Sequence, residues 1–470
     1  MRTDYIKYKV LVNKENKIKD KFLSRIELIT TKDVDDLDVQ VEKETYSAYL
    51  KLKEFLATKN IIIGIASAYR SKEYQQEIYD EYIKKYGKDY ADKVVAPVGY
   101  SEHHTGLAID INIMVNGTWP SSNNELMEEV EHYKAIHKYL ADYGFILRYP
   151  EGKEDITGYP YEPWHIRYTG KTVAKIIKKE NYTLEEYLSD YSGVIVVNKK
   201  SNMTSFDVVN EISRTLGIKK LGHTGTLDPL AEGVLVVTVG KATKIAELLT
   251  ATYKEYQAGV ILGVETDTLD ITGKITNSKI VPDNLPIEKV LKSFKKTYLQ
   301  EVPIYSAVKV KGKKLYEYAR ENKPVELPKK EVTIKEISLL ETDRNTFIFK
   351  ALVSKGCYIR SLIRDIGESL DTYATMTNLT RTKQGKYTLT DAYTLEDISS
   401  GNFNLLKIED ALDYPKIVAD KKLSFKIKSG QRLKNEYNIK DKVIFIDQNN
   451  KLLGIYQVEN EDLKVWKNFV

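Results

Sequence analysis

The stretch GHTGTLDPLAEG, residues 222–233, sets a single carboxylate among glycine, threonine and proline residues. Its glycines and its proline break both helical and strand periodicity, so the sequence predicts a loop here. Pro229 disfavours the α region for the residue before it, which pushes Asp228 towards an extended backbone with its carboxylate directed away from the chain. The residue is therefore either an ordinary turn former or a catalytic group.

The segments around this loop favour the catalytic interpretation. They add an aromatic residue that could stack on a base and an arginine that could pair with the carboxylate, so together they predict a nucleobase site. No segment resembles a cradle for nucleotide phosphates, and chemistry without a cofactor is favoured. The segments are GVIVVNKKSNMTSFDVVNEI (193–212), KEYQAGVILGVETDTLDITG (254–273), PIYSAVKVKGKKLYEYAR (303–320) and SKGCYIRSLIRDIG (354–367).

Taken together, these segments closely resemble the TruB family of tRNA pseudouridine synthases over about residues 192–400. The resemblance implies a reaction without cofactor on the T-loop uridine, position 55, of the tRNA T-arm. Asp228 would drive cleavage of the glycosidic bond and its rejoining through carbon. The basic segment 303–332 would be a mobile thumb that grips the RNA through phosphate contacts. The other implied site residues are Tyr256, which stacks on the flipped uracil, Arg360, which pairs with Asp228, His223, which holds the flipped nucleotide, Leu379, which closes the pocket, and Lys199, which contacts substrate.

One segment departs from the family pattern. The usual N-K-P-x-G-x-T-S is NKKSNMTS at 198–205, with Lys200 and Asn202 in place of the proline and the glycine. The change leaves Asp228 and the motif glycines intact. We expect it to affect the geometry of the turn that carries Lys199, and RNA affinity, rather than catalysis.

A second constellation lies in the first part of the chain. SEHHTGLAIDINI (101–113) reads as a polar loop entering an alternating strand, and EPWH returns at 162–165. His103, Asp110 and His165 would give a zinc ion three ligands and leave one position open, as a catalytic site requires. Glu162 could then accept the proton of the attacking water, and Arg70 could stabilise an oxyanion.

These two motifs resemble the S-x-H-x-x-G-x-A-x-D and E-x-W-H signatures of the zinc D-alanyl-D-alanine carboxypeptidase and dipeptidase family (VanY- and VanX-like), over about residues 5–170. The resemblance implies the same roles: His103, Asp110 and His165 as zinc ligands, Glu162 as general base and Arg70 at the transition state. Ser101 and Gln75 resemble substrate-contacting positions. The implied substrate is a short peptide ending in D-alanine.

Composition and periodicity bound the rest. A chain of 470 residues predicts more than one domain, and its 30% charged residues and short apolar runs predict no membrane segment. Mixed helical and strand signals predict an α+β class. Cys357 alone cannot form an internal disulfide. We expect a cytoplasmic monomer. Helical spacing predicts helices over 43–60 and 71–87, and an apolar run predicts a strand over 61–71. The predicted domains are an α+β zinc domain at 1–170, a helical linker at 171–191, a mixed-sheet synthase domain at 192–412 and a small C-terminal PUA-like β-barrel at 413–470, for which a plain β-appendage is the alternative.

Two enzyme activities and one binding role remain open from the sequence. Residues 1–190 carry 28 Lys and Arg against 32 Asp and Glu, whereas the remainder carries 44 against 35, which suits a phosphate-bearing partner for the second part. The alternative to a synthase is an RNA-binding tRNA chaperone, with the zinc peptidase as the main catalytic activity. Asp228 argues for the synthase.

Overall fold

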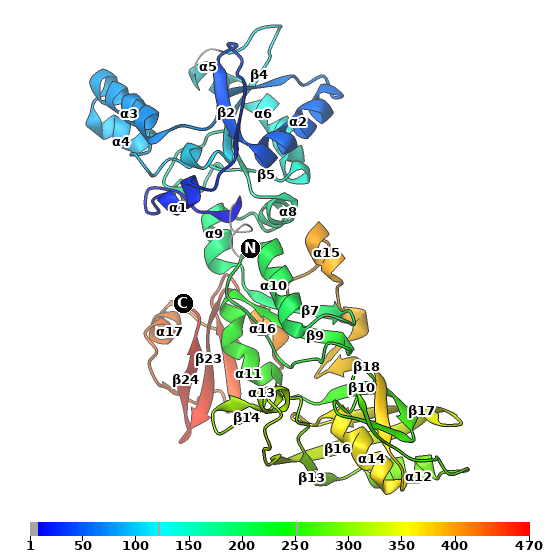
Figure 1. Ribbon diagram of the computed structural model, residues 1–470. Helices are drawn as coiled ribbons and strands as arrows, with labels where there is room; N and C mark the ends of the chain where they lie inside the picture. Colours follow the sequence, from blue (N-terminus) through cyan, green and yellow to red (C-terminus); the bar gives the residue numbers. More distant parts are fainter. Residues whose placement is uncertain (1–7, 121–122, 251) are drawn as a thin grey trace. The chain divides into compact units, whose positions relative to one another are not determined.

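The computed structural model describes residues 8–120, 123–250 and 252–470, and its internal contacts divide them into two compact units (Figure 1). The first unit runs to Tyr191 and also takes in Glu211–Lys219 and Glu396–Phe403; the second contains the rest. Within these described ranges, no helix combines the length and the apolar character needed to cross a bilayer. The predicted α+β class is confirmed.

An antiparallel four-stranded sheet with the order β3-β4-β6-β5 forms the centre of the first unit. The amphipathic helices α2 and α6 cover it. Leu52 of α2 and Ile136 of α6 join Ile109 of the sheet in one buried core. The helices and the strand predicted from periodicity at 43–60, 71–87 and 61–71 are confirmed. The elements are β3 (Ile63–Ser67), β4 (Ala108–Ile113), β5 (Phe145–Leu147), β6 (His165–Tyr168), α2 (Lys43–Ala57), α3 (Lys72–Tyr86) and α6 (Val130–Leu140).

The remaining elements of this unit are short and surround the sheet. Helices α3 and α4 lie side by side, as Figure 1 shows. The segment 171–191, expected as a helical linker, forms helices α8 and α9, and contacts group both with the first unit. The elements are β1 (Leu28–Lys32), β2 (Asp38–Glu42), α1 (Asp20–Leu23), α4 (Lys88–Val94), α5 (Asn123–Glu128), α7 (Glu154–Thr157), α8 (Lys171–Glu180), α9 (Leu184–Asp190) and the 3₁₀ turns η2 (Glu102–Thr105) and η3 (Ala141–Tyr143).

A large sheet with the order β13-β16-β17-β10-β18-β9-β7 organises the second unit, with β8 paired to β9 and β19 to β18. Among the described strands of this sheet, only β9 and β18 pair in parallel, so the sheet is mixed. Strands β7 and β9 are almost continuously buried, as expected for strands covered on both faces. The strands are β7 (Gly193–Lys199), β8 (Leu221–His223), β9 (Glu232–Val239), β10 (Lys254–Leu262), β13 (Thr297–Glu301), β16 (Lys329–Asp343), β17 (Thr346–Val353), β18 (Ala374–Gln384) and β19 (Tyr387–Thr388).

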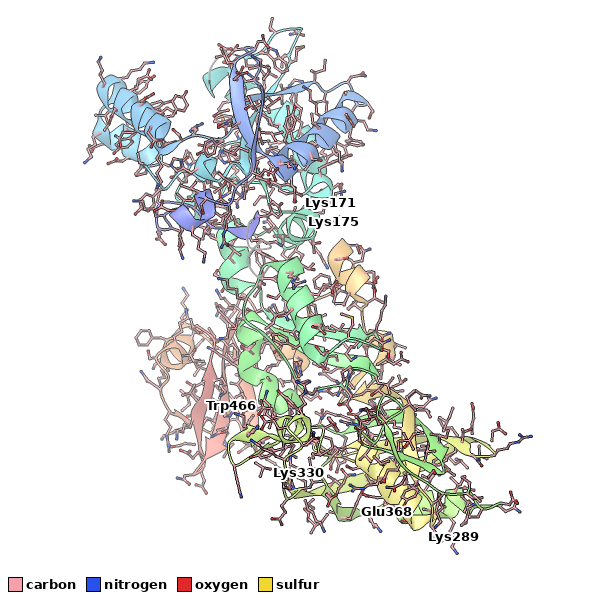
Figure 2. The ribbon with its side chains drawn as sticks, in the orientation of Figure 1. Lys171, Lys175, Lys289, Lys330, Glu368 and Trp466 are labelled. Carbon is pink, nitrogen blue, oxygen red and sulfur yellow. The ribbon has the colours of Figure 1, made fainter. Side chains whose placement is uncertain are left out.

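Helices and small hairpins complete this unit. Helix α14 packs against β18 through Leu362, Ile363 and Ile366, which are fully buried. The surface of this unit exposes side chains of both charges, and Figure 2 labels three of them: Lys289 on α12, Lys330 on β16 and Glu368 on α14. The predicted thumb contains β14, β15 and α13. The elements are α10 (Ser205–Leu216), α11 (Ala246–Thr250), α12 (Ile287–Ser293), α13 (Leu315–Arg320), α14 (Ile359–Ser369), α15 (Leu395–Ser400), α16 (Ile408–Ala411), β11 (Val264–Thr266), β12 (Ile275–Ser278), β14 (Lys309–Val310), β15 (Lys313–Lys314) and the 3₁₀ turns η4 (Gly240–Ile245) and η5 (Leu389–Asp391).

The C-terminal segment forms a five-stranded sheet with the order β20-β22-β23-β24-β21. Helix α17 packs on it, and Ile427 shares a buried cluster with Phe445 and Tyr456. The predicted β structure is confirmed, but in the described part of the chain no pairing between β20 and β21 closes the sheet into a barrel. The elements are β20 (Lys416–Val418), α17 (Lys421–Lys428), β21 (Leu433–Lys434), β22 (Lys442–Ile446), β23 (Leu452–Glu459) and β24 (Asp462–Asn468).

Candidate active sites

The first unit brings the three predicted metal ligands together. Asp110 and His165 are direct partners in the antiparallel pairing of β4 with β6, and the 3₁₀ turn η2 presents His103 beside them. Gly106, with φ +66°, ends this turn in the left-handed conformation that lets the chain enter β4. One ligand atom from each of the three side chains lies within 4.8 Å of the other two.

The donor atoms of this cluster fit a metal ion. His103 Nδ1 donates to the Ala68 carbonyl at 2.5 Å, which leaves the lone pair of Nε2 facing Asp110 Oδ2 at 3.2 Å. His165 Nδ1 lies 3.0 Å from Asp110 Oδ1, a buried oxygen without a hydrogen-bond partner. Electron pairs that face one another at such distances need a proton or a metal ion between them. Two imidazoles and one carboxylate are a set that zinc accepts.

The two histidines have opposite electrostatic surroundings. Burial, together with the Arg70 guanidinium, lowers the pKa of His103 to about 4, so its imidazole is neutral. Burial also disfavours a charge on His165, but the Asp110 carboxylate outweighs it and raises the pKa of His165 to about 9. In the metal-free site at neutral pH, His165 is therefore a positively charged imidazolium with a proton on each ring nitrogen.

A cavity of about 400 Å³ opens next to the three ligands, and both predicted catalytic side chains line it. Arg70 donates to Asp110 Oδ2 at 3.1 Å and to Ser67 Oγ. Glu162 Oε2 lies 3.5 Å from His165 Nδ1. Burial raises the pKa of Glu162 to about 7, despite the opposing charge of His165. This carboxylate can therefore accept a proton near neutral pH.

The two positions predicted to contact substrate also line this cavity. Ser101 is buried at the N-cap of η2 and lines the cavity. Gln75 donates from Nε2 to the Ala96 carbonyl, and its buried Oε1 has no hydrogen-bond partner. Their role with substrate stays a prediction. The neighbouring His104 donates from Nδ1 to the Arg70 carbonyl and accepts from the Gly99 amide at Nε2.

In the second unit, Asp228 forms an ion pair with Arg360. Arg360 Nε lies 2.8 Å from Asp228 Oδ2, and its other nitrogens donate to the Thr268 and Tyr305 carbonyls. Arg360 is 5% exposed and sits at the start of α14, so the guanidinium is held from three sides. Asp228 keeps 33% of its side chain exposed. The carboxylate is therefore both fixed and reachable from solvent.

A cavity of about 300 Å³ lies at this ion pair. Tyr256 from β10 and Leu379 from β18 line it, because β10 and β18 are neighbours and Leu379 pairs with Ala258. Cys357 also lines it, and burial raises the pKa of its thiol to about 12, so the thiol stays protonated at neutral pH. The cavity thus combines a carboxylate, an arginine and an aromatic ring, as predicted.

Two other predicted substrate contacts lie outside the lining of this cavity. The ammonium of Lys199 is buried and donates to the Lys200, Met203 and Pro229 carbonyls, so here it supports the loop that carries Asp228. Burial lowers the pKa of His223, which lies on β8. Their contacts with RNA stay predictions.

The departure at 198–205 places Asn202 at a left-handed position of the turn. Asn202 has φ +65°, a left-handed conformation that asparagine tolerates better than most residues. Its amide donates to the Pro229 carbonyl at 2.8 Å. The replacement of glycine by Asn202 is therefore compatible with the loop next to Asp228.

Comparisons with known proteins agree with this geometry. Residues 213–359 match the model of the TruB family pseudouridylate synthase N-terminal domain, and residues 360–413 match the tRNA pseudouridylate synthase B C-terminal domain. The chain is 41% identical to tRNA pseudouridine synthase B of Caldanaerobacter subterraneus subsp. tengcongensis, over 58% of this chain and 97% of the relative. It is 46% identical to the Bacillus licheniformis enzyme of that name, over 51% of this chain and 82% of the relative. The chain belongs to the TruB family of pseudouridine synthases.

This TruB protein also carries a domain of a second family. Residues 38–171 match the D-alanyl-D-alanine carboxypeptidase (VanY) model. A solved structure of a mutant of the vancomycin resistance D,D-pentapeptidase VanY, in complex with Zn(II), is 31% identical and covers 39% of this chain and 99% of that chain, with a TM-score of 0.33. Both resemblances inferred from the sequence are thus confirmed.

Several residues at the two sites of this TruB protein were not singled out from the sequence. In the synthase unit, Arg381 is fully buried and donates to the Val234 and Gly225 carbonyls. In the carboxypeptidase domain, Glu102, Arg148 and Arg167 are buried charges. Glu102 neighbours His103 in the quoted motif, but no sequence pattern shows that distant charges pair inside a fold.

Proposed function

We propose that the synthase unit converts the T-loop uridine at position 55 of tRNA to pseudouridine, without a cofactor. The observation that carries this proposal is the pairing of a partly exposed Asp228 with a buried Arg360 at 2.8 Å beside a cavity lined by Tyr256. The uridine must leave its stack to reach such a cavity. Because its substrate is tRNA, we propose that the chain acts in the cytoplasm.

Each residue of the cavity has its own role in this reaction. Asp228 supplies the carboxylate that drives cleavage of the glycosidic bond and rejoining of the base through carbon. Arg360 keeps this carboxylate in place through its ion pair and through its bonds to two backbone carbonyls. Tyr256 offers a ring face to the flipped uracil, and the basic segment 303–332 contacts RNA phosphates.

The test compares pseudouridine formation in an unmodified tRNA transcript by the wild-type chain, D228N and D371N. Asp371 is a matched control, since it is an exposed aspartate paired with Lys279, and asparagine tolerates its left-handed backbone. We expect D228N to bind tRNA without modifying it and D371N to retain activity. If the wild type binds tRNA without modifying it, the unit is an RNA chaperone and the proposal is wrong.

We further propose that the first domain is a zinc-dependent carboxypeptidase or dipeptidase acting on a short peptide that ends in D-alanine. His103, Asp110 and His165 would hold the ion, which would supply a Lewis acid for the scissile carbonyl. Glu162 takes the proton of the attacking water. Arg70 lies beside the ligands and offers positive charge to the carbonyl oxygen as it becomes negative.

Zinc content and D-alanine release test this second activity. We expect about one zinc ion per wild-type chain. H165A should lose the ion, whereas H132A should keep it, because His132 is an exposed histidine paired with Glu129. E162Q should keep zinc and lose D-alanine release. Unchanged zinc content in H165A would show that the ligand assignment is wrong.

A further inference from the structure

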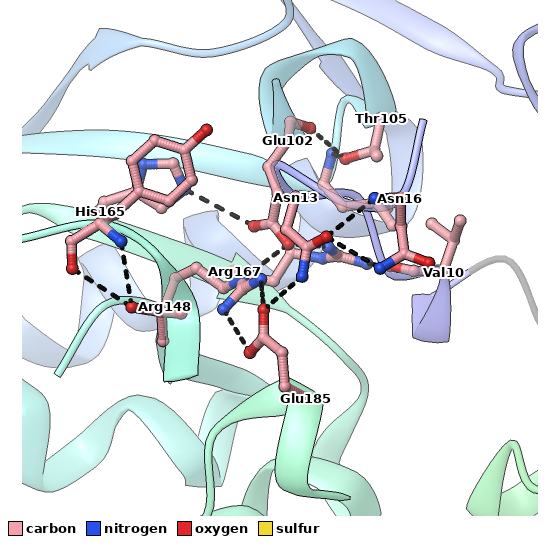
Figure 3. A network of polar contacts seen from close by, with 12 residues as sticks. Val10, Asn13, Asn16, Glu102, Thr105, Arg148, His165, Arg167 and Glu185 are labelled. Atoms are coloured by element: carbon pink, nitrogen blue, oxygen red, sulfur yellow. Dashed lines mark hydrogen bonds and ion pairs between the residues drawn. The ribbon is translucent and has the colours of Figure 1, made fainter. Parts of the chain in front are cut away.

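A network of paired charges lies next to the predicted metal ligand His165 (Figure 3). Glu102 is fully buried, and its Oε1 accepts from Arg148 Nε at 2.7 Å and from Arg167 Nη1 at 2.6 Å. Its other oxygen, Oε2, has no hydrogen-bond partner and lies 3.6 Å from His165 Nε2. One oxygen of Glu102 is therefore held by two guanidinium groups while the other is left facing the histidine.

The network of paired charges extends from Arg148 to helix α9. Arg148 donates from Nη1 to Glu185 Oε2 at 3.0 Å and from Nη2 to Glu185 Oε1 at 2.6 Å. Glu185 Oε1 also accepts from Asn13 Nδ2 at 3.0 Å. Arg148 thus uses all three of its nitrogens, one on Glu102 and two on Glu185. A guanidinium held in this way has a single orientation.

Helix α9 is itself held in place at its first turn. Thr183 and Glu186 form a capping box, and Glu186 also pairs with Lys153 at 3.0 Å through both of its oxygens. Helix α9 lies beyond residues 38–171, which match the carboxypeptidase family model. A helix between the two family regions therefore contacts the charge network behind the metal ligands.

The free oxygen of Glu102 matters because of how His165 must bind a metal. Nδ1 of His165 faces Asp110, so a metal ion would bind at Nδ1 and Nε2 would carry the hydrogen. A metal-binding imidazole usually donates this other N–H to a carboxylate or carbonyl, which fixes the ring orientation. Glu102 Oε2 lies nearest to that role, and closing 3.6 Å to a hydrogen bond needs a shift of less than about 1 Å.

We propose that Glu102 is the positioning residue that orients His165 for the metal, and that helix α9 belongs to the metal centre because Glu185, through Arg148, holds Glu102 in place. This inference rests on the proposed zinc site. A purely structural ion network would contribute to folding and leave the metal unaffected. The two roles are separated by measuring the metal directly.

The experiment uses the full chain and the variants E102Q, E185Q and E180Q. Zinc affinity is measured by chelator competition, and the metal geometry is followed by the visible spectrum of the cobalt-substituted protein. Loss of an outer hydrogen-bond partner weakens metal binding by about 10- to 100-fold. We expect a loss in that range for E102Q and about tenfold for E185Q, each with an altered cobalt spectrum. E180Q, at the exposed last residue of α8 and with the same change of charge, should stay within about twofold.

A double variant distinguishes one connected chain from two separate effects. If Glu185 acts through Glu102, E102Q/E185Q should bind zinc about as well as E102Q alone, because the two losses are coupled. Near-ultraviolet circular dichroism of the metal-free proteins checks that each variant is folded. If E102Q does not fold, E102D, which keeps the charge but shortens the side chain, takes its place beside E185Q.

The outcomes are distinct. Wild-type affinity and spectrum in E185Q would overturn the role of helix α9, and the same result in E102Q or E102D would overturn the positioning role. Fully additive losses in the double variant would show that Glu185 does not act through Glu102. Failure of the wild-type chain to bind zinc or cobalt would instead overturn the proposed zinc site itself.

Discussion

Raising the pH from 7 to 9 should tighten zinc binding to the carboxypeptidase domain about fiftyfold, because zinc must displace the proton on His165. With a pKa of about 9, His165 is neutral in about 1% of metal-free molecules at pH 7 and in about half at pH 9. His103, with a pKa of about 4, is neutral throughout and adds no pH dependence. The sign follows from the raised pKa: protonated His165 stabilises the metal-free site at low pH and competes with zinc there.

Two measurements check this reasoning. Zinc dissociation constants between pH 7 and 9 are obtained by chelator competition, and calorimetry at pH 8 in buffers of different ionisation enthalpy counts the protons released. At pH 8, His165 should release about 0.9 proton per zinc ion bound. Ionisation of a zinc-bound water can only add to that number. Glu162, with a pKa of about 7, is already largely ionised at pH 8 and so adds little to that count.

A change of less than about fivefold in affinity between pH 7 and 9, or release of less than about half a proton at pH 8, would refute the argument. Either result would mean that Asp110 does not hold a proton on His165 in the metal-free site.

Three further outcomes follow from the contacts. E162Q should stabilise the metal-free chain by up to about 3 kcal/mol at pH 8 and by little at pH 4. Burial raises the pKa of Glu162 from its ordinary value of 4.5 to about 7, so the cost of its charge in the folded chain builds up as pH rises between these two values. Urea unfolding at both pH values measures the difference, and an equal effect at both would contradict the cause. R360K should slow pseudouridine formation at least about tenfold, because the single ammonium of lysine cannot replace three separate guanidinium nitrogens on Asp228 and both backbone carbonyls. R364K, whose arginine pairs with Glu301 instead, is the control in the same assay on a tRNA transcript, and equal rates for the two variants would contradict the prediction. R381A should lower the free energy of unfolding of the synthase unit by about 3 kcal/mol, because it leaves the Val234 and Gly225 carbonyls buried without their donor. Chemical denaturation measures this loss, and a value below about 1 kcal/mol would show that water replaces the guanidinium.

Much of the fold and both sites could be predicted because their signals are local. The loop around Asp228 and the motifs that contain His103, Asp110 and His165 are short contiguous segments whose residue types and spacing suffice. The helices at 43–60 and 71–87 follow from apolar spacing. Closure of the C-terminal barrel was not predictable in this way, since it depends on whether two edge strands meet, and here β20 and β21 remain the edges of an open sheet.

The sequence by itself determined the two families and singled out the candidate reactive groups, because motif residues lie within a few positions of one another. Only the tertiary structure decided which charges are paired and buried. The motif predicted Lys199 as a substrate contact but did not show that its buried ammonium bonds to three backbone carbonyls of neighbouring turns. Arg148 meets Glu102 and Glu185 across separations of 46 and 37 residues. The physical reason is that a charge can be buried only where folding brings its partner to it, and no local pattern specifies that meeting.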